Sequence, residues 1–251
     1  MSGDGNSLKS WVRTLNEVEG MTLLDLARPG MRLTLWRQEA DNALTQADDN
    51  YRSLLIKLVE RMLLDHDGER ILNSRYLVNF QAGWPQLRME LFLVRYGLSH
   101  PWPALAGQKL LFPALEAAEA AGEAPQVTLA DFDALVDAHI DPTVGASSRK
   151  KTRSTIVGLF KKLGVLDSAG SRAPLMIHRL QPAPLAFGWA LSRELSEQKI
   201  AHVTESWATR ESAAAAVYLP TRDYASRCLE AAVSDGMIAR PPLKVGFQMA
   251  G

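Results

Sequence analysis

The segment ASSRKKTRSTIVGLFKKLGVLDSAG, residues 146–170, decides how this chain is expected to fold. Successive helical residues are 100° apart, so the apolar side chains of this segment fall on one face, while cations, hydroxyls and Gly158 cover the other. Gly164 is a typical helix stop. It is followed by an apolar run, a Gly/Ser turn and a second run from Leu175 to Leu180. This part of the pattern predicts a short β-hairpin.

A further helix is expected just before this segment, over TLADFDALVDAHI (128–140). It begins with a capping-box pattern, in which Thr128 is the N-cap and Asp131 lies three residues later. Its apolar face comprises Leu129, Phe132, Val136 and Ile140. A capped helix, a second helix and a hairpin follow the order of a winged helix. The connection DPTVGASS is, however, longer than the three or four residues of a tight helix-turn-helix.

The remaining sequence predicts helices with few strands. Apolar residues recur at helical spacing in NYRSLLIKLVERMLLD (50–65), and Pro113 should kink or split the helix that starts near Pro101. GEAPQ (122–126) is a candidate linker. Most of the strand content should lie in 165–180 and 237–249, each forming a short hairpin.

We therefore predict a mainly α fold: a helical bundle followed by a winged-helix-like unit with a short β-hairpin, and a second helical, winged-helix-like C-terminal unit. The expected organisation is a disordered tail (1–7), the helical bundle (8–125), the winged-helix-like DNA-binding unit (126–181) and the C-terminal helical unit with a short hairpin (182–251).

Composition restricts the possible function classes. The chain has 251 residues with 28 basic and 28 acidic side chains, so a partner can only be inferred from how charge is distributed. A single cysteine, Cys228, excludes an internal disulfide and a multi-cysteine metal site, which fits a reducing cytoplasm. The N-terminal residues lack the pattern of a signal peptide, and no apolar run is long enough for a membrane span. The expected location is cytoplasmic.

The distribution of charge is uneven. Segment 146–170 holds six basic residues, and no acidic residue lies between Asp141 and Asp167. Most charged helix faces are simply solvated, but such faces usually mix both signs. Cations with short hydroxyl donors match the needs of DNA phosphates. The predicted DNA-contacting residues are Ser148, Arg149, Lys150, Lys151, Thr152, Arg153, Ser154, Lys161 and Lys162 on the helix, with Arg172 and Arg179 in the wing.

Two motifs together resemble a known family. ADFDALVDAH, followed by SSRKKTRSTIVGLFKKLGVL, is similar to the acidic-aromatic helix and the Leu-Gly-hydrophobic-Leu ending found in the BrxA family of BREX phage-defence systems. RSLLIKLVERMLLD and WPQLRMELFLVRYGL are similar in spacing, so the resemblance covers roughly residues 50–180. It implies a non-enzymatic component of a defence system that binds double-stranded DNA, with other defence-system proteins as further partners.

No catalytic motif is recognisable, so we expect neither an enzyme nor a cofactor, metal or small-molecule substrate. The five histidines are scattered, and the cluster DHD (65–67) lies where a helix should end. Two alternatives stay open. One is a protein-interaction adaptor without DNA binding, which the neutral net charge favours. The other is a winged-helix transcription regulator, whose recognition helix should carry Asn, Gln or Arg toward base edges.

Overall fold

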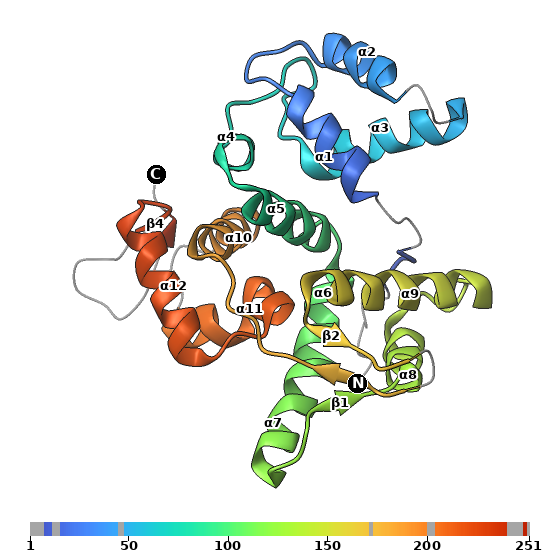
Figure 1. The fold of residues 1–251 in the computed structure, drawn as a ribbon, viewed down its shortest axis with the longest axis vertical. Helices are drawn as coiled ribbons and strands as arrows, with labels where there is room; N and C mark the ends of the chain where they lie inside the picture. The colour runs from blue at the N-terminus through green and yellow to red at the C-terminus, as the bar shows by residue number, and fades with distance from the viewer. Residues whose placement is uncertain are drawn as a thin grey trace. The chain divides into compact units, whose positions relative to one another are not determined.

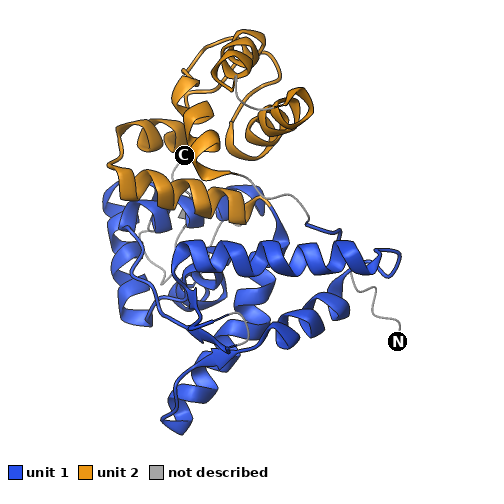
Figure 2. Ribbon diagram, turned by 45° about the vertical axis from the view of Figure 1, so that its right-hand side comes forward, with its two compact units in different colours: residues 1–13, 100–251 blue, residues 14–99 orange. Residues whose placement is uncertain are grey.

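The computed structural model is mainly helical and divides into two compact units (Figure 2). We call Thr14–Ser99 the helical unit, and Met1–Arg13 together with His100–Gly251 the larger unit. The sequence prediction grouped residues 8–125 in one bundle, whereas residues 100–121 pack with the later part of the chain. The structure describes residues 8–11, 16–44, 48–170, 173–199, 204–239 and 248–249. The predicted disordered tail, 1–7, lies outside these residues.

The described residues of the helical unit form five helices, several of which start at recognisable capping residues. Asn16, Asp48 and Ser74 accept hydrogen bonds from backbone N–H groups at the starts of α1, α3 and α4. Pro85 occupies the first turn of α5, where its missing N–H costs nothing. The helix predicted over 50–65 is confirmed. The bounds are α1 Glu17–Leu26, α2 Leu33–Ala43, α3 Asp49–Leu63, α4 Arg75–Ala82 and α5 Pro85–Leu98.

From His100 onward, the larger unit begins with one long helical run that is interrupted by a π-helical turn. Pro113 cannot donate to the carbonyl of Lys109, and the Phe112 N–H instead bonds the Gly107 carbonyl five residues back. The expected split at Pro113 is therefore confirmed. The first elements are α6 Pro101–Ala106, the π turn η1 Gly107–Leu111, α7 Phe112–Ala121, β1 Gln126–Val127, α8 Leu129–His139, α9 Ala146–Leu163, β2 Leu166–Asp167 and β3 Leu175–Ile177.

The small sheet after α9 has three antiparallel strands in the order β1–β3–β2 (Figure 1). Val127 lies opposite Leu175, and Leu166 lies opposite Ile177; all four side chains are buried, so one face of the sheet joins the core. The predicted hairpin over 165–180 is confirmed. Strand β1 was missed, because it is two residues long and overlaps the predicted linker.

The end of the larger unit repeats this order of elements. Helices α10 to α12 are followed by two paired strands, which confirms the hairpin expected within 237–249. A second π turn, η2, leads into α11. The bounds are α10 Pro184–Glu197, η2 Trp207–Glu211, α11 Ala213–Tyr218, α12 Arg222–Ser234, β4 Ile238–Ala239 and β5 Gln248–Met249.

The N-terminal segment 8–11 belongs to the larger unit. Leu8 bridges Ile140 at the end of α8, and the indole Nε1 of Trp102 donates to the Lys9 carbonyl at 2.9 Å. Trp11 stacks on His100, with ring centroids 5.4 Å apart, and burial lowers the His100 pKa to about 4. In sequence, the helical unit is thus inserted into the larger unit between Arg13 and His100.

Candidate nucleic-acid interface

Helix α9 is anchored by its apolar face. Ile156, Leu159 and Phe160 are buried, and the helix packs against α6, α8 and β2 (Figure 1). Gly164 adopts φ 84°, a left-handed conformation that ends the helix and lets its N–H bond the Phe160 and Lys161 carbonyls. The backbone N–H of Trp11 donates to the Thr152 hydroxyl at 2.9 Å, so the N-terminal segment also fixes α9. No sequence pattern pointed to that contact.

The opposite face of α9 is open and carries cations. We call it the lysine face; it consists of Lys150, Lys151, Ser154, Gly158, Lys161 and Lys162. The four lysines and Ser154 are exposed. A Cβ added at Gly158 would meet nothing within 4 Å, so the middle of the face has no bulk. With a rise of about 1.5 Å per residue, the two lysine pairs lie about 16 Å apart along the helix.

Two predicted DNA contacts, Arg149 and Arg153, are instead used within the fold. Arg149 pairs with Asp137 at 3.0 Å, and its other nitrogens donate to the Val144 and Pro142 carbonyls. Arg153 pairs with Asp133 at 2.6 Å. Both acids lie on α8, so the carboxylate-free run in the sequence is not free of carboxylates in space. These arginines hold α8, α9 and their connection together.

The hydroxyl residues at the start of α9 also differ from the prediction. Thr152 is fully buried, and its hydroxyl donates to the Ser148 carbonyl while it accepts from Trp11, so it cannot reach DNA. This corrects its assignment as a contact residue. Ser148 is half-buried. Ser154 is exposed but donates its hydroxyl proton to the Lys150 carbonyl, which leaves its oxygen lone pairs outward.

The structure describes one of the two residues that were predicted to contact DNA from the wing. Arg172 lies outside the described residues. Arg179 makes a two-pronged ion pair with Glu119 of α7 and also donates to the Pro220 carbonyl, so it ties three segments together rather than facing outward. This ion pair lowers the pKa of the Glu119 carboxyl. Lys161 Nζ donates to the Ser168 hydroxyl at 2.8 Å, where the β2–β3 turn begins.

The ion pairs of Arg149 and Arg153 were not predicted, because the prediction considered only the charges within segment 146–170. A signal for these pairs existed: Asp133 and Asp137 are four residues apart on α8, as are Arg149 and Arg153 on α9. Residues four apart lie on one helix face, so two such rows can match when the helices pack antiparallel through a short turn.

The acidic residues of the DHD cluster, which were considered as a possible metal or acid–base site, make contacts within the fold. Asp65 pairs with the buried Arg95, and Asp67 accepts from the backbone N–H groups of Glu69 and Arg70, which lowers its pKa. The described part of the chain contains no group of three metal-ligating side chains. Cys228 is buried in α12 beside the Pro182 carbonyl. Among the described helices, none is both long and apolar enough to cross a bilayer.

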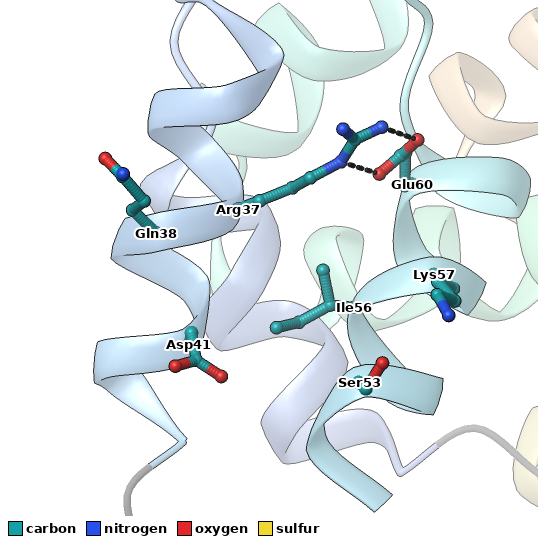
Figure 3. Close-up of a pocket in the computed structure, with 7 residues that line it drawn as sticks. All are labelled: Arg37, Gln38, Asp41, Ser53, Ile56, Lys57 and Glu60. Atoms are coloured by element: carbon teal, nitrogen blue, oxygen red, sulfur yellow. Dashed lines mark hydrogen bonds and ion pairs between the residues drawn. The ribbon is translucent and has the colours of Figure 1, made fainter. Parts of the chain in front are cut away.

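The helical unit has a hollow of about 670 Å³ between α2 and α3. In Figure 3, Arg37 reaches from α2 to Glu60 on α3, and Ile56 points into the space between the helices. The ion pair lowers the pKa of Glu60. At the other end, Asp41 pairs with Arg52. The charged groups at both ends are therefore committed to joining the helices.

Comparison of the chain with protein-family models, with curated proteins and with solved structures finds no match. The candidate interface therefore rests on the geometry of α9 and its surroundings.

Proposed function

We propose that this protein binds double-stranded DNA without catalysing a reaction, and that the lysine face of α9 contacts the phosphate backbone. The observation that carries the proposal is that every exposed charged residue of α9 is a lysine, on a helix whose opposite face is buried. A surface of one sign attracts a polyanion, whereas a mixed surface does not.

The order of elements around α9 supports the proposal. Helix α7, β1, α8, α9, β2 and β3 follow one another, with the sheet order β1–β3–β2. We interpret this as a winged helix in which α9 holds the position of the recognition helix and the β2–β3 turn that of the wing. The hydrogen bond from Lys161 to Ser168 joins helix and turn into one surface.

The chemistry of the lysine face favours contacts that do not depend on base sequence. Lysine, serine and glycine supply point charges and hydroxyls but no planar donor–acceptor pair for a base edge. The arginines that could have read guanine, Arg149 and Arg153, are held by carboxylates of α8. A DNA-binding component of a BREX-type phage-defence system fits this chemistry better than a sequence-specific regulator, and the defence role rests on the resemblance to the BrxA family.

A protein-interaction adaptor is the second candidate, in which the lysine face binds an acidic protein. The neutral net charge favours it, because autonomous DNA-binding domains are usually basic.

A salt titration separates the two candidates. Binding to two unrelated duplexes is measured by fluorescence anisotropy for the wild type, for the double variant Lys150→Ala/Lys151→Ala and for Lys57→Ala, which removes an exposed lysine of the helical unit. If the four lysines contact phosphates, the slope of log K against log salt should be about −2 to −4, similar on both duplexes.

The double variant should bind both duplexes more weakly, with a slope shallower by about 1 to 2, because two phosphate contacts are lost. Lys57→Ala should behave like the wild type. No binding at low salt, or an unchanged slope in the double variant, would exclude DNA as the partner of this face and leave the adaptor.

A further inference from the structure

The larger unit contains a hollow of about 360 Å³ whose walls include both π-helical turns. Residues of η1 and α7 form one side and residues of η2 form the other. The lining residues are Gln108, Lys109, Phe112, Pro113, Glu116, Trp207, Arg210 and Glu211. Well under 1% of residues are π-helical, and single π turns concentrate at functional sites. The presence of two π turns at one hollow therefore makes the hollow a candidate functional site.

Local sequence and packing fix both turns. Pro113 enforces η1, and Ser212 ends η2 by donating its backbone N–H to the Trp207 carbonyl five residues back. Gly107 lies so close to α11 that an added Cβ would be 2.0 Å from the Ala216 carbonyl oxygen. The hollow thus stands on close backbone contacts and is not a loose surface depression.

Some polar groups of the hollow are already engaged. The Gln108 side-chain amide donates to the Glu211 carbonyl at 2.5 Å, which links the two π turns. Glu116 and Arg210 form an ion pair at 2.6 Å. Within the described residues, the Lys109 ammonium and the Glu211 carboxylate are exposed and have no ion-pair partner. Of the two aromatic lining residues, Trp207 is half-exposed and Phe112 is buried.

We infer that this hollow binds a nucleoside phosphate. An aromatic ring offers a stacking surface to any base. A lysine suits a phosphate as a point charge, and a free carboxylate can accept hydrogen bonds from ribose hydroxyls, as acidic residues do in dinucleotide-binding folds. Trp207, Lys109 and Glu211 supply one group of each kind. The volume lies at the lower end of the range for small-ligand sites.

This inference goes beyond DNA binding by α9, since the hollow uses no residue of the lysine face. It also departs from the expectation that the protein has no small-molecule ligand. The same chemistry is present in a free nucleotide and in an unpaired nucleotide at a DNA end, so the experiment separates these sources.

Isothermal titration calorimetry tests the wild-type chain with AMP, UMP, adenosine and inorganic phosphate at concentrations up to about 5 mM. Both nucleotides should give saturable binding, adenosine weaker binding, and phosphate alone none. Trp207→Leu should weaken AMP binding at least about fivefold, since stacking on an aromatic side chain has that effect. Lys109→Ala should weaken AMP but leave adenosine unchanged, which a general loss of folding would not do.

Trp84→Leu is the matched control, because Trp84 is an exposed tryptophan of the helical unit, and it should bind AMP like the wild type. A duplex with a three-nucleotide overhang and a blunt duplex, compared on the Lys150→Ala/Lys151→Ala background, test the second source. Preference for the overhang that Trp207→Leu removes, without AMP binding, would assign the hollow to a DNA end. Binding of neither ligand, or equal binding by Trp207→Leu and the wild type, would overturn the inference, whatever the lysine face binds.

Discussion

Two regions of the larger unit share one order of elements but differ in surface chemistry. In the first, α8 and α9 precede the β2–β3 hairpin; in the second, α11 and α12 precede the β4–β5 hairpin. The exposed charged residues of α9 are all lysines, whereas α12 exposes Arg222 and Arg227 together with Asp223 and Glu230. Of these two helices, α9 alone exposes charge of one sign.

The position of the carboxylates explains this difference. In the first region the acids that pair with α9 lie on α8, where Asp133 and Asp137 are neutralised by arginines. In the second region the acids lie on α12 itself, among its exposed cations. We therefore expect the placement of acids on the second helix, rather than the order of elements, to decide whether such a unit can bind DNA.

The two regions also differ in how closely a helix packs at a glycine, on α9 in the first and at the contact between α10 and α12 in the second. Gly158 of α9 faces open space, whereas Gly188 of α10 faces α12, and a Cβ there would be 2.6 Å from the Ala232 Cβ and 2.9 Å from the Met237 Cε. The middle of the lysine face is free for a partner. The contact between α10 and α12 belongs to the core.

The largest effect is expected from Gly188→Ala, which inserts a methyl group into the α10–α12 contact. Overpacking of this kind costs about 1–3 kcal/mol of unfolding free energy. Gly158→Ala makes the same chemical change on an exposed helix face and should stabilise the protein by about 0.5–1 kcal/mol, because alanine loses less backbone entropy. Urea denaturation measures both. Equal effects of the two substitutions would mean that the regions do not differ in packing as described.

The same two regions show which parts of the fold could be predicted from the sequence. Local patterns foresaw the α8 capping box, the α9 apolar face with its Gly164 stop, and both hairpins, because each depends on residues close together in the chain. Strand β1 escaped notice, since a two-residue strand has no periodicity and is defined by its pairing with Leu175 and Met176.

The candidate site was predictable only for side chains that do not depend on distant partners. Lys150, Lys151, Lys161 and Lys162 are exposed as expected. The roles of Arg149, Arg153 and Arg179 depend on carboxylates 12, 20 and 60 residues away. Thr152 faces a backbone N–H 141 residues distant. The prediction that Thr152 contacts DNA was wrong, because the partner that holds its hydroxyl lies too far along the chain to be foreseen.

A second test removes the two α8 acids that neutralise arginines of α9. Asp133→Asn/Asp137→Asn should release Arg149 and Arg153 toward solvent, so DNA affinity should rise and the salt slope steepen by up to about 0.9 per arginine. Each ion pair is partly exposed, so the loss of stability should stay below about 1 kcal/mol per pair. Anisotropy titrations on a single duplex measure the slope.

The control is Asp223→Asn on α12, which removes an acid far along the chain and should leave the salt slope unchanged. If the double variant also leaves the salt slope unchanged, the arginines remain held by the Val144 and Pro142 carbonyls or by the introduced asparagines.

The smallest effect is expected on α12, and it tests the comparison most directly. Arg222→Ala/Arg227→Ala removes two exposed cations, as many as Lys150→Ala/Lys151→Ala removes from α9. If mixed charge makes α12 unsuitable for a polyanion, affinity for duplex DNA should change by less than about twofold and the salt slope should stay the same, since no phosphate contact is lost. Arg227 lies 5.2 Å from the Tyr224 ring centroid, so a loss of up to about 1 kcal/mol of stability is expected and circular dichroism should check the fold. Weakening equal to that of the α9 variant would mean that DNA covers both hairpin regions, and that the acids of α12 do not prevent its cations from contacting phosphates.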